Sequence, residues 1–282
     1  MRKLLLGQVN YLNCLPVYHA IEEDLLPLEV ELIRGTPAQL NQMFLANKID
    51  LAPLSSIEYA RHSEKAIILP DLSISADGRV ASILFFSKLP VTELEEKKVL
   101  VTTASATSVA LLQILLEHYY HVQAEIQPAS PDLPAMLALA EGALLIGDDA
   151  MRAHQQVKNE GWPVIVTDLG EVWKEFTGEK MVYALWLIQK DFTLSFPEET
   201  ENIARLLCAA KKIGWANVPT LVVKAQQRTG LPLPVLEDYF TIIKHEFGPD
   251  YRRALLTFYD YAYKSGLIKE RVKLDVWGEE NA

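Results

Sequence analysis

The sequence predicts an α/β protein of two lobes with a cleft between them. Short apolar runs alternate with helical patterns through the first two-thirds of the chain, which is typical of βαβ units and a largely parallel sheet. A second series of this kind begins after the polar loop at 89–98, and a strand pattern at 181–188 precedes a mostly helical C-terminal segment. Two series followed by a return strand indicate two lobes joined by connections that cross between them.

The first series alternates strands and helices of ordinary length. Thr36 followed by Pro37 is typical of a helix start, because Thr caps the first turn and Pro fits the first helical position. Ser55 or Ser56 can cap a further helix that carries Glu58 in its first turn. The expected strands are 3–9, 29–34, 50–53, 66–69 and 80–87, and the expected helices are 16–23, 37–46 and 55–60.

The second series repeats this order. Its expected strands are 99–102, 125–127 and 143–146, and its expected helices are 109–118 and 134–140. The turn 104–108 joins the first of these strands to its helix, and the letters GDDA at 147–150 follow the last strand. After residue 198 the helical pattern is interrupted at Pro219, at 230–232 and at 248–249, where Pro and Gly end helices.

This order is that of the periplasmic-binding-protein-like fold (type 2), in which a ligand lies in the central cleft and the lobes hinge around it. We expect the chain to cross between the lobes near 87–90 and near 182–190. The first lobe is then discontinuous, with residues 1–88 and 190–282, and the second lobe contains residues 89–189.

Composition and charge exclude several classes of function. The 27 Lys and Arg residues against 37 Asp and Glu residues give a net charge of −10, which argues against a nucleic-acid partner. Cys14 and Cys208 match no metal-binding spacing, and the six histidines form no close metal pattern, so we expect no metal. No window has the 18 or more apolar residues of a membrane span. The sequence makes no prediction of the oligomeric state.

The start of the chain resembles a secretory signal only in its first residues. The basic Met1-Arg2-Lys3 is followed by an apolar run that stops at Gly7, which is too short for the apolar region of a signal peptide. We therefore expect a first buried strand here, and a cytoplasmic protein.

Four polar clusters follow the expected strands, at 11–13, 55–58, 105–108 and 147–149. Ligands of open α/β sheets lie beyond the carboxyl ends of the strands, where helix N-termini expose unpaired N–H groups. Each cluster alone is an ordinary set of helix caps, but two come from each half of the chain and face each other if the lobes close. Ser105, Thr107 and Ser108 exceed what capping needs and suit a carboxylate or a phosphate. No glycine-rich phosphate loop is present, so a nucleotide is a poorer fit.

The ordered set of these segments resembles the chorismate dehydratase family of the futalosine route to menaquinone. The likeness covers most of the first 190 residues, in the segments VNYLNCLP, RGTPAQLNQMFLANKIDLAPLSSIEYA, SISADGRVASILFFS, TTASATSVALLQILL, LLIGDDAMR and DLGEVWKEFTG. The resemblance implies a carbon–oxygen lyase that converts chorismate, a small dicarboxylate, to 3-[(1-carboxyvinyl)oxy]benzoate and water without a cofactor. One departure is Glu179-Lys180, where the family is more apolar, and we expect it to affect the packing of the return strand rather than the fold.

The resemblance also implies roles for individual residues. Asn13 would act on the leaving hydroxyl or the ring substituents, Ser82 would act from the opposite side of the ring, and Tyr11 would belong to the same wall as Asn13. The expected carboxylate ligands are Ser105, Thr107 and Ser108, with Ser56 and Asp148 as secondary binding residues and Arg79 as a counter-charge. Glu58 is a candidate base, although the helix dipole explains a first-turn glutamate equally well, and the substrate's enolpyruvyl carboxylate is the alternative proton acceptor.

Two other functions stay open. One is the sister enzyme 1,4-dihydroxy-6-naphthoate synthase, which shares the fold but uses a reactive histidine; here the first turn reads YLNCLP and no histidine lies in an expected cleft turn. The other is a non-catalytic binding protein for a small carboxylate, which would require export. Product formation separates chorismate dehydration from both.

Overall fold

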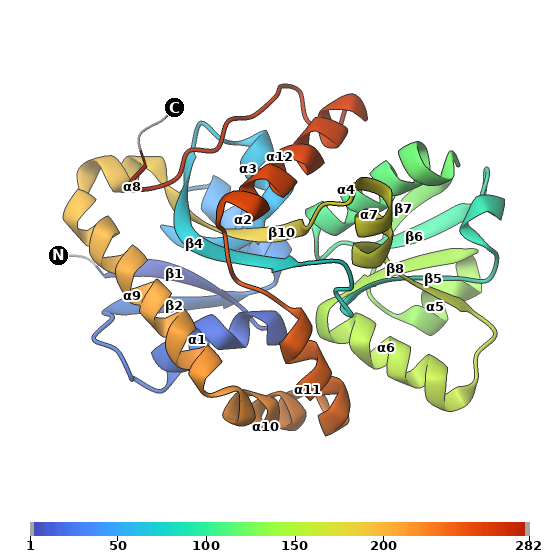
Figure 1. Cartoon of the computed structure of the whole chain (residues 1–282), viewed down its shortest axis with the longest axis horizontal. Helices are drawn as coiled ribbons and strands as arrows, with labels where there is room; N and C mark the ends of the chain where they lie inside the picture. Colours follow the sequence, from blue (N-terminus) through green and yellow to red (C-terminus); the bar gives the residue numbers. More distant parts are fainter. Residues whose placement is uncertain (1–2, 280–282) are drawn as a thin grey trace.

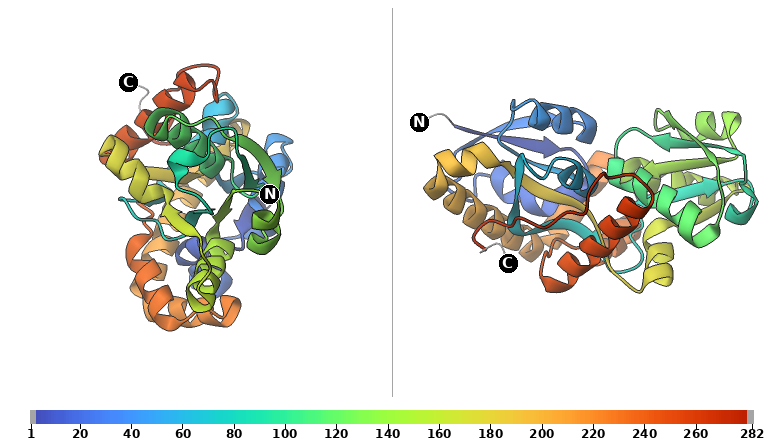
Figure 2. Two further views of the ribbon diagram at one scale, coloured as in Figure 1. Left: turned by 90° about the vertical axis from the view of Figure 1, so that its right-hand side faces the viewer. Right: turned by 90° about the horizontal axis from the view of Figure 1, so that it is seen from above.

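The computed structural model describes residues 3–279 and contains two five-stranded mixed sheets, side by side along the long axis (Figure 1). The strand order is β2-β1-β3-β10-β4 in the first sheet and β7-β6-β8-β5-β9 in the second. Helices surround each sheet, and the view from above separates the two lobes (Figure 2). This confirms the two-lobed α/β architecture. Residues 1–2 and 280–282, which belong to the expected first lobe, lie outside the described residues.

The first lobe combines the N-terminal third of the chain with its C-terminal part. In chain order its elements are β1 (Leu4–Val9), η1 (Leu12–Cys14), α1 (Leu15–Glu22), β2 (Val30–Gly35), α2 (Pro37–Leu45), β3 (Leu51–Ser55), α3 (Ser56–Arg61), β4 (Ala66–Ala76), β10 (Met181–Gln189), α8 (Lys190–Ser195), α9 (Pro197–Ala216), α10 (Val218–Thr229), α11 (Leu233–Ile242) and α12 (Pro249–Lys264).

The second lobe is formed by the intervening chain. Its elements are β5 (Ile83–Ser87), η2 (Val91–Glu93), β6 (Lys98–Thr102), α4 (Ala106–Leu115), the π-helical turn η3 (Leu116–Tyr120), β7 (Glu125–Ala129), α5 (Leu133–Leu139), β8 (Gly142–Ile146), α6 (Gly147–Glu160), β9 (Ile165–Asp168) and α7 (Leu169–Thr177).

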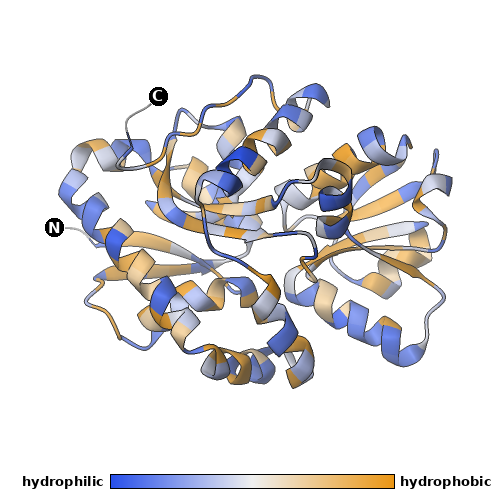
Figure 3. Ribbon diagram, viewed as in Figure 1, coloured by the Kyte–Doolittle hydropathy of each residue, from blue (hydrophilic) through white to orange (hydrophobic). Residues whose placement is uncertain are grey.

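Local sequence explains several of these boundaries. The expected start of α2 is confirmed as a capping box, in which the Thr36 hydroxyl and the Gln39 side chain each accept from the other residue's backbone N–H. The inner strands of both sheets are apolar and buried, the edge strands β2, β7 and β9 are partly exposed, and the outward helix faces are polar (Figure 3). Trp173 and Trp186 are fully buried, as expected of core residues.

Parallel pairing brings the polar clusters to one place. β1 pairs in parallel with β2 and β3, and β6 pairs in parallel with β7 and β8. The carboxyl ends of β1, β3, β6 and β8 are therefore followed by the clusters at 11–13, 55–58, 105–108 and 147–149. All four clusters contribute to the region between the lobes that is described below.

Both expected crossing points are wrong. β4 ends at Ala76 in the first sheet and β5 begins at Ile83 in the second, so the first crossing lies at 77–82 instead of 87–90. β9 belongs to the second sheet and β10 begins at Met181 in the first, so the chain returns at the end of α7 instead of within 182–190. The expected boundaries at 88 and 190 shift accordingly, because strand periodicity shows that a segment is buried but not which sheet it joins.

Other expectations were wrong in detail. β4 extends to 76, beyond the expected 69, because the Pro70-Asp71 interruption hides its second half. β9, α7 and α8 were not expected, and α4 begins at Ala106 instead of 109. Thr107 and Ser108 therefore lie in the first turn of a helix and not in a loop before it.

The departure at Glu179-Lys180 is accommodated by α12. Glu179 pairs with Arg253 at 3.2 Å, and the Lys180 ammonium lies 3.6 Å from Asp250 and 4.5 Å from the centre of the Tyr251 ring. Both polar side chains are thus held by α12 just before the start of β10. No helix between residues 3 and 279 is long and apolar enough to cross a membrane.

Candidate active site between the lobes

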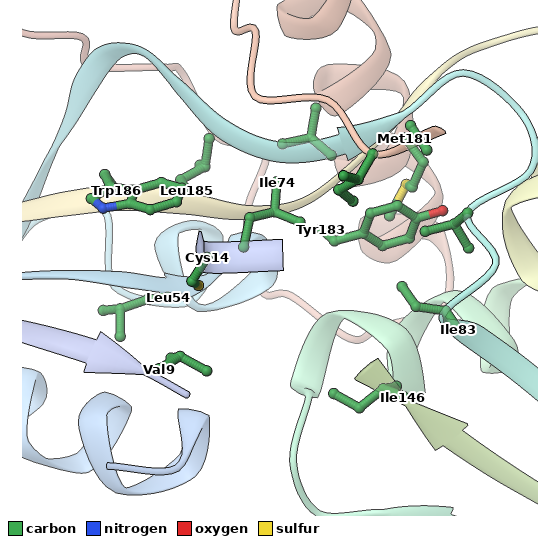
Figure 4. Packing of buried hydrophobic residues seen from close by; sticks show 14 of the residues in the cluster. Val9, Cys14, Leu54, Ile74, Ile83, Ile146, Met181, Tyr183, Leu185 and Trp186 are labelled. Carbon is green, nitrogen blue, oxygen red and sulfur yellow. The ribbon is translucent and has the colours of Figure 1, made fainter. Parts of the chain in front are cut away.

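A cavity lies where the two lobes meet, with about 570 Å³ of space between atoms, part of it open to solvent. Its walls come from both sheets and from the first crossing. The lining residues are Val9, Tyr11, Asn13, Cys14, Pro37, Pro53, Leu54, Ser55, Ile74, Val80, Ser82, Ile83, Ala104, Ser105, Ser108, Ile146, Gly147, Tyr183, Ala184 and Ile243. Figure 4 shows the apolar part of these walls, with Val9 and Leu54 on one side and Ile83 and Ile146 on the other.

The first wall is the turn after β1, which contains Tyr11 and Asn13. The Oδ1 atom of Asn13 is buried and has no hydrogen-bond partner among residues 3–279. Behind this turn the Nε2 atom of His245 lies 2.7 Å from the Asn13 carbonyl oxygen. Burial lowers the pKa of His245 to about 4, so the ring is neutral near pH 7 and donates its Nε2–H to that carbonyl. The Asn13 side chain is left available to a ligand.

The opposite wall contains Ser82, at the end of the first crossing. Its hydroxyl lies 3.2 Å from the Tyr239 hydroxyl and 3.4 Å from the Val80 carbonyl oxygen. Its own carbonyl accepts the Gly147 N–H at 2.6 Å. Burial raises the pKa of Tyr239 well above its usual value, so this phenol stays protonated and can donate to Ser82. Ser82 is therefore held by its backbone and supplied with a donor by Tyr239.

The start of α4 supplies two more hydroxyls. Ser105 is the N-cap and accepts the Ser108 N–H at 3.2 Å, and the two hydroxyl oxygens are 3.0 Å apart. Both side chains line the cavity. The first N–H groups of any α-helix have no partner within the helix. Together with the hydroxyls they form an environment that favours a carboxylate.

Ser56 and Thr107, both expected to bind substrate, lie beside this wall and are not among the lining residues. The Thr107 Oγ1 atom accepts the Ile57 N–H at 3.2 Å and lies 3.3 Å from the Ser56 hydroxyl. Ser56 donates to the Val182 carbonyl at 2.8 Å. Their hydroxyls therefore connect α3 of the first lobe with α4 of the second.

Asp148 also connects the lobes. Its carboxylate accepts the Leu12 N–H at 3.0 Å, across from the second lobe to the first. Burial raises the pKa of Asp148 to about 6, against the effect of this N–H. Burial, then the charges of Asp149 and Asp148, raises the pKa of Tyr11 to about 12. Asp148 is absent from the cavity wall, so the structure places it behind the Tyr11 turn.

Arg79 and Glu58 lie away from the cavity wall. Arg79 pairs with Asp238 at 2.8 Å, and both side chains are 48% exposed. Glu58 is buried and pairs with Arg61 at 2.7 Å. Arg79, expected as a counter-charge, and Glu58, expected as a candidate base, are thus paired with other side chains outside the cavity wall.

Sequence reasoning missed Tyr183 and His245, and it considered Ser55 only as a cap. Tyr183 lines the cavity from β10, and its buried hydroxyl has no partner within the described part of the chain (Figure 4). Burial raises its pKa well above the usual value. A strand tyrosine and a distant histidine carry no local pattern that could have revealed them. The GDD cluster, by contrast, did point to Gly147.

Most of the cavity wall is apolar, and its polar groups are uncharged. None of the described lining residues is Asp, Glu, His, Lys or Arg. Burial raises the pKa of Cys14 as well as those of Tyr11 and Tyr183, so these groups also stay neutral near pH 7. Within residues 3–279 there is no cluster of His, Cys, Asp and Glu side chains that could hold a metal ion. The site can orient a ligand with hydroxyl, amide and N–H groups.

A family model described as menaquinone biosynthesis matches residues 4–264. Two curated relatives carry the name chorismate dehydratase. The chain is 28% identical over 275 residues to the one from Thermus thermophilus, covering 92% of this chain and 94% of the relative. It is 28% identical over 185 residues to the one from Campylobacter jejuni, covering 64% of this chain and 66% of the relative.

Solved structures share the fold. A protein from Archaeoglobus fulgidus superposes with a TM-score of 0.79 at 18% identity, over 94% of this chain and 98% of that one. The periplasmic aliphatic sulphonate binding protein of Escherichia coli superposes with a TM-score of 0.70 at 14% identity, over 100% and 94%. The periplasmic-binding-protein-like fold expected from the sequence is thereby confirmed.

Proposed function

The chain belongs to the menaquinone biosynthesis family, and we propose that it is a chorismate dehydratase, a hydro-lyase of the futalosine route. The names of the two curated relatives support this proposal, because one of them is similar over almost the whole chain. The observation in the structure that carries the proposal is the uncharged cavity between the lobes, with hydroxyl and amide groups on opposite walls.

The proposed reaction is a balanced elimination. The bond between a ring carbon and its hydroxyl oxygen breaks, the proton on the neighbouring ring carbon is removed, and a double bond forms between the two carbons. The products are water and 3-[(1-carboxyvinyl)oxy]benzoate. Because the ring becomes aromatic, the substrate supplies the driving force and the oxidation level does not change overall. Positioning and preorganised donors can then supply much of the acceleration.

We assign the groups of the two walls to this reaction. Asn13 would contact the leaving hydroxyl or the ring substituents, and Ser82, supplied with a proton donor by Tyr239, would contact the opposite side of the ring. Ser105 and Ser108 at the start of α4 would hold a carboxylate. Tyr11 would support the Asn13 wall. We assign Ser56, Thr107 and Asp148 to the contact between the lobes instead of to direct binding.

The absence of a charged lining residue bears on the proton acceptor. No described residue of the wall is a carboxylate, an imidazole or an amine, and the tyrosines and the thiol are protonated near pH 7. The substrate itself carries an enolpyruvyl carboxylate next to the proton that leaves. We therefore favour this carboxylate over Glu58 as the acceptor, since Glu58 is paired with Arg61 outside the wall.

Two further expectations remain proposals. We divide the chain into a discontinuous first lobe and an inserted second lobe, with the boundaries placed at the observed crossings. A cytoplasmic location stays a prediction from the sequence.

The test is to incubate the purified, metal-free protein with chorismate and to follow the products by chromatography and mass spectrometry. We expect a product that is one water lighter and has an aromatic ring. Asn13→Ala and Ser82→Ala should lower kcat by about a hundredfold or more. Ser87→Ala is the matched control for Ser82, because Ser87 is a buried serine at the other end of β5 and lies outside the cavity wall.

Other outcomes separate the alternatives. Chorismate that binds but stays unchanged would support a binding protein, and chorismate that does not bind would contradict the proposed substrate. Turnover of only the substrate of 1,4-dihydroxy-6-naphthoate synthase would support the sister enzyme.

A further inference from the structure

One side chain, Asp168, accepts two backbone N–H groups of the first crossing between the lobes. This residue ends β9 and is the N-cap of α7, on the second lobe. Its Oδ1 atom accepts the N–H groups of Gly170 at 2.9 Å and Glu171 at 3.2 Å, and it also accepts the Val80 N–H at 3.2 Å. Its Oδ2 atom accepts the N–H groups of Val80 at 3.1 Å and Ala81 at 2.7 Å. One carboxylate therefore joins the start of α7 to the residues immediately before Ser82.

The backbone that Asp168 holds has an unfavourable conformation. Ala81 has φ of +61°, in the left-handed region that side chains with a Cβ atom disfavour. The Ala81 N–H donates to Asp168, and the carbonyl of the next residue, Ser82, accepts the Gly147 N–H. The backbone is thus bound on both sides of the Ala81 Cα atom. The left-handed turn therefore persists because its neighbours hold it.

The start of α7 is packed closely onto the same crossing. A Cβ atom at Gly170 would lie 2.3 Å from the Gly78 carbonyl oxygen and 2.8 Å from the Tyr183 hydroxyl, so only glycine permits this approach. The approach brings Asp168 within reach of the Val80 and Ala81 N–H groups. Helix, crossing and cavity wall thus form one connected unit.

We propose that Asp168 is a positioning residue for the dehydration, and that its carboxylate holds Ala81 in the left-handed turn that directs Ser82 into the cavity. The role rests on the proposed function of Ser82. Asp168 does not touch the cavity itself, since it is absent from the wall. Its effect passes through two backbone N–H groups and one peptide bond to the side chain that faces the substrate.

Asp168→Asn separates this role from ordinary helix capping. Asn is as good an N-cap as Asp, so its one carbonyl oxygen can keep the bonds to Gly170 and Glu171. Its amide NH₂ group then faces the Ala81 N–H, which cannot accept a hydrogen bond, while the Val80 N–H keeps only its bond to the remaining oxygen. The left-handed residue before Ser82 therefore loses the acceptor of its N–H while α7 keeps its cap. Asp132→Asn is the matched control, because Asp132 caps α5 through the Ala135 N–H at 3.0 Å, away from the crossing.

The experiment compares steady-state kinetics of wild type, Asp168→Asn, Asp132→Asn, Ala81→Gly and the double variant Asp168→Asn/Ala81→Gly. We expect Asp168→Asn to lower kcat on the order of tenfold to a hundredfold with a KM change below about threefold. Adding Ala81→Gly should restore most of the lost kcat, because glycine adopts the left-handed turn without the cost that a Cβ atom imposes. Asp132→Asn should retain the kcat of wild type within about twofold.

A readout independent of activity is amide hydrogen exchange of the peptide that contains Val80 and Ala81, which should be faster in Asp168→Asn than in wild type. An unchanged kcat in Asp168→Asn, a double variant no better than Asp168→Asn, or unchanged exchange would overturn the proposal. If wild type itself does not dehydrate chorismate, the proposed reaction fails. The exchange result then decides alone whether Asp168 holds the turn.

Discussion

The two walls of the cavity present similar polar side chains but are supported by different chemistry. The Asn13 turn is held from behind by a neutral imidazole, His245, which comes from the distant C-terminal part of the first lobe. The Ser82 turn is held by a carboxylate, Asp168, which comes from the helix at the return crossing. In both walls the support binds the backbone next to the functional side chain and not that side chain itself. Because one support is an imidazole and the other a carboxylate, the stability and activity that each wall contributes should respond differently to acid and to substitution.

The largest effect in this comparison is expected from His245. His245→Leu removes the donor to the Asn13 carbonyl and leaves that oxygen unsatisfied, which should lower kcat by about tenfold or more and the free energy of unfolding by about 1–3 kcal/mol. His245→Gln, whose amide can donate, should recover part of both losses. Steady-state kinetics and urea unfolding measure these changes, and His118→Leu, at a histidine bonded to Ser265 away from the cavity, is the control.

The pH dependence of stability sharpens this difference. The pKa of His245 is depressed to about 4 in the folded protein, below the ordinary 6.5, so the contribution of its neutral form is fully present above about pH 6.5. It is lost as the pH falls through 4, at up to about 1.4 kcal/mol per pH unit. Urea unfolding from pH 7 to pH 4 should show a steeper loss in wild type than in His245→Leu. Parallel curves would contradict this assignment.

A smaller effect on the free energy of unfolding, with the opposite pH dependence, is expected from Asp148, which connects the second lobe to the Asn13 turn. Burial raises the pKa of Asp148 in the folded protein to about 6, above its ordinary value of 3.8, so its stabilising contribution is fully present below about pH 3.8 and is lost as the pH rises through 6. Asp148→Asn, which stays uncharged and can still accept from Leu12, should therefore gain about 2 kcal/mol relative to wild type between pH 4 and pH 7. Thermal unfolding across this range measures the gain.

The neighbouring Asp149 provides the control for that measurement. Its carboxylate pairs with Arg152 at 2.6 Å near the surface, so Asp149→Asn should change stability by less than about 1 kcal/mol. A gain in Asp149→Asn as large as in Asp148→Asn would show that general charge, and not burial between the walls, determines the effect.

The smallest effect is expected from Thr107, at the contact between the lobes. Thr107→Val keeps the shape but leaves the buried Ile57 N–H without its acceptor, which should lower the free energy of unfolding by about 1 kcal/mol. Thr107→Ser keeps the hydroxyl and is the control. Ser108→Ala, at a lining residue, should instead raise the KM for chorismate. A larger KM increase in Thr107→Val than in Ser108→Ala would contradict this assignment and show that Thr107 binds the substrate carboxylate.

The sequence predicted the parts of the site that lie in strand-end turns. Asn13, Ser105 and Ser108 follow parallel strands, whose carboxyl ends meet by the geometry of the sheet, so local patterns were sufficient. The sequence could not predict His245 or Asp168, because each acts through contacts with residues more than 80 positions away. The crossing points failed for a related reason, since strand pairing is not encoded in the apolar pattern of one strand.

The pairing of β4 with β10 has a consequence for how the molecule can be taken apart. The chain leaves the first sheet after Ala76 and re-enters it at Met181, and these two residues are antiparallel partners in the same sheet. Partners of this kind lie about 5 Å apart. The second lobe is therefore an insertion between two adjacent strands of the first sheet. A short engineered turn between 76 and 181 would join these strands as a hairpin and leave the strand order of the first sheet unchanged.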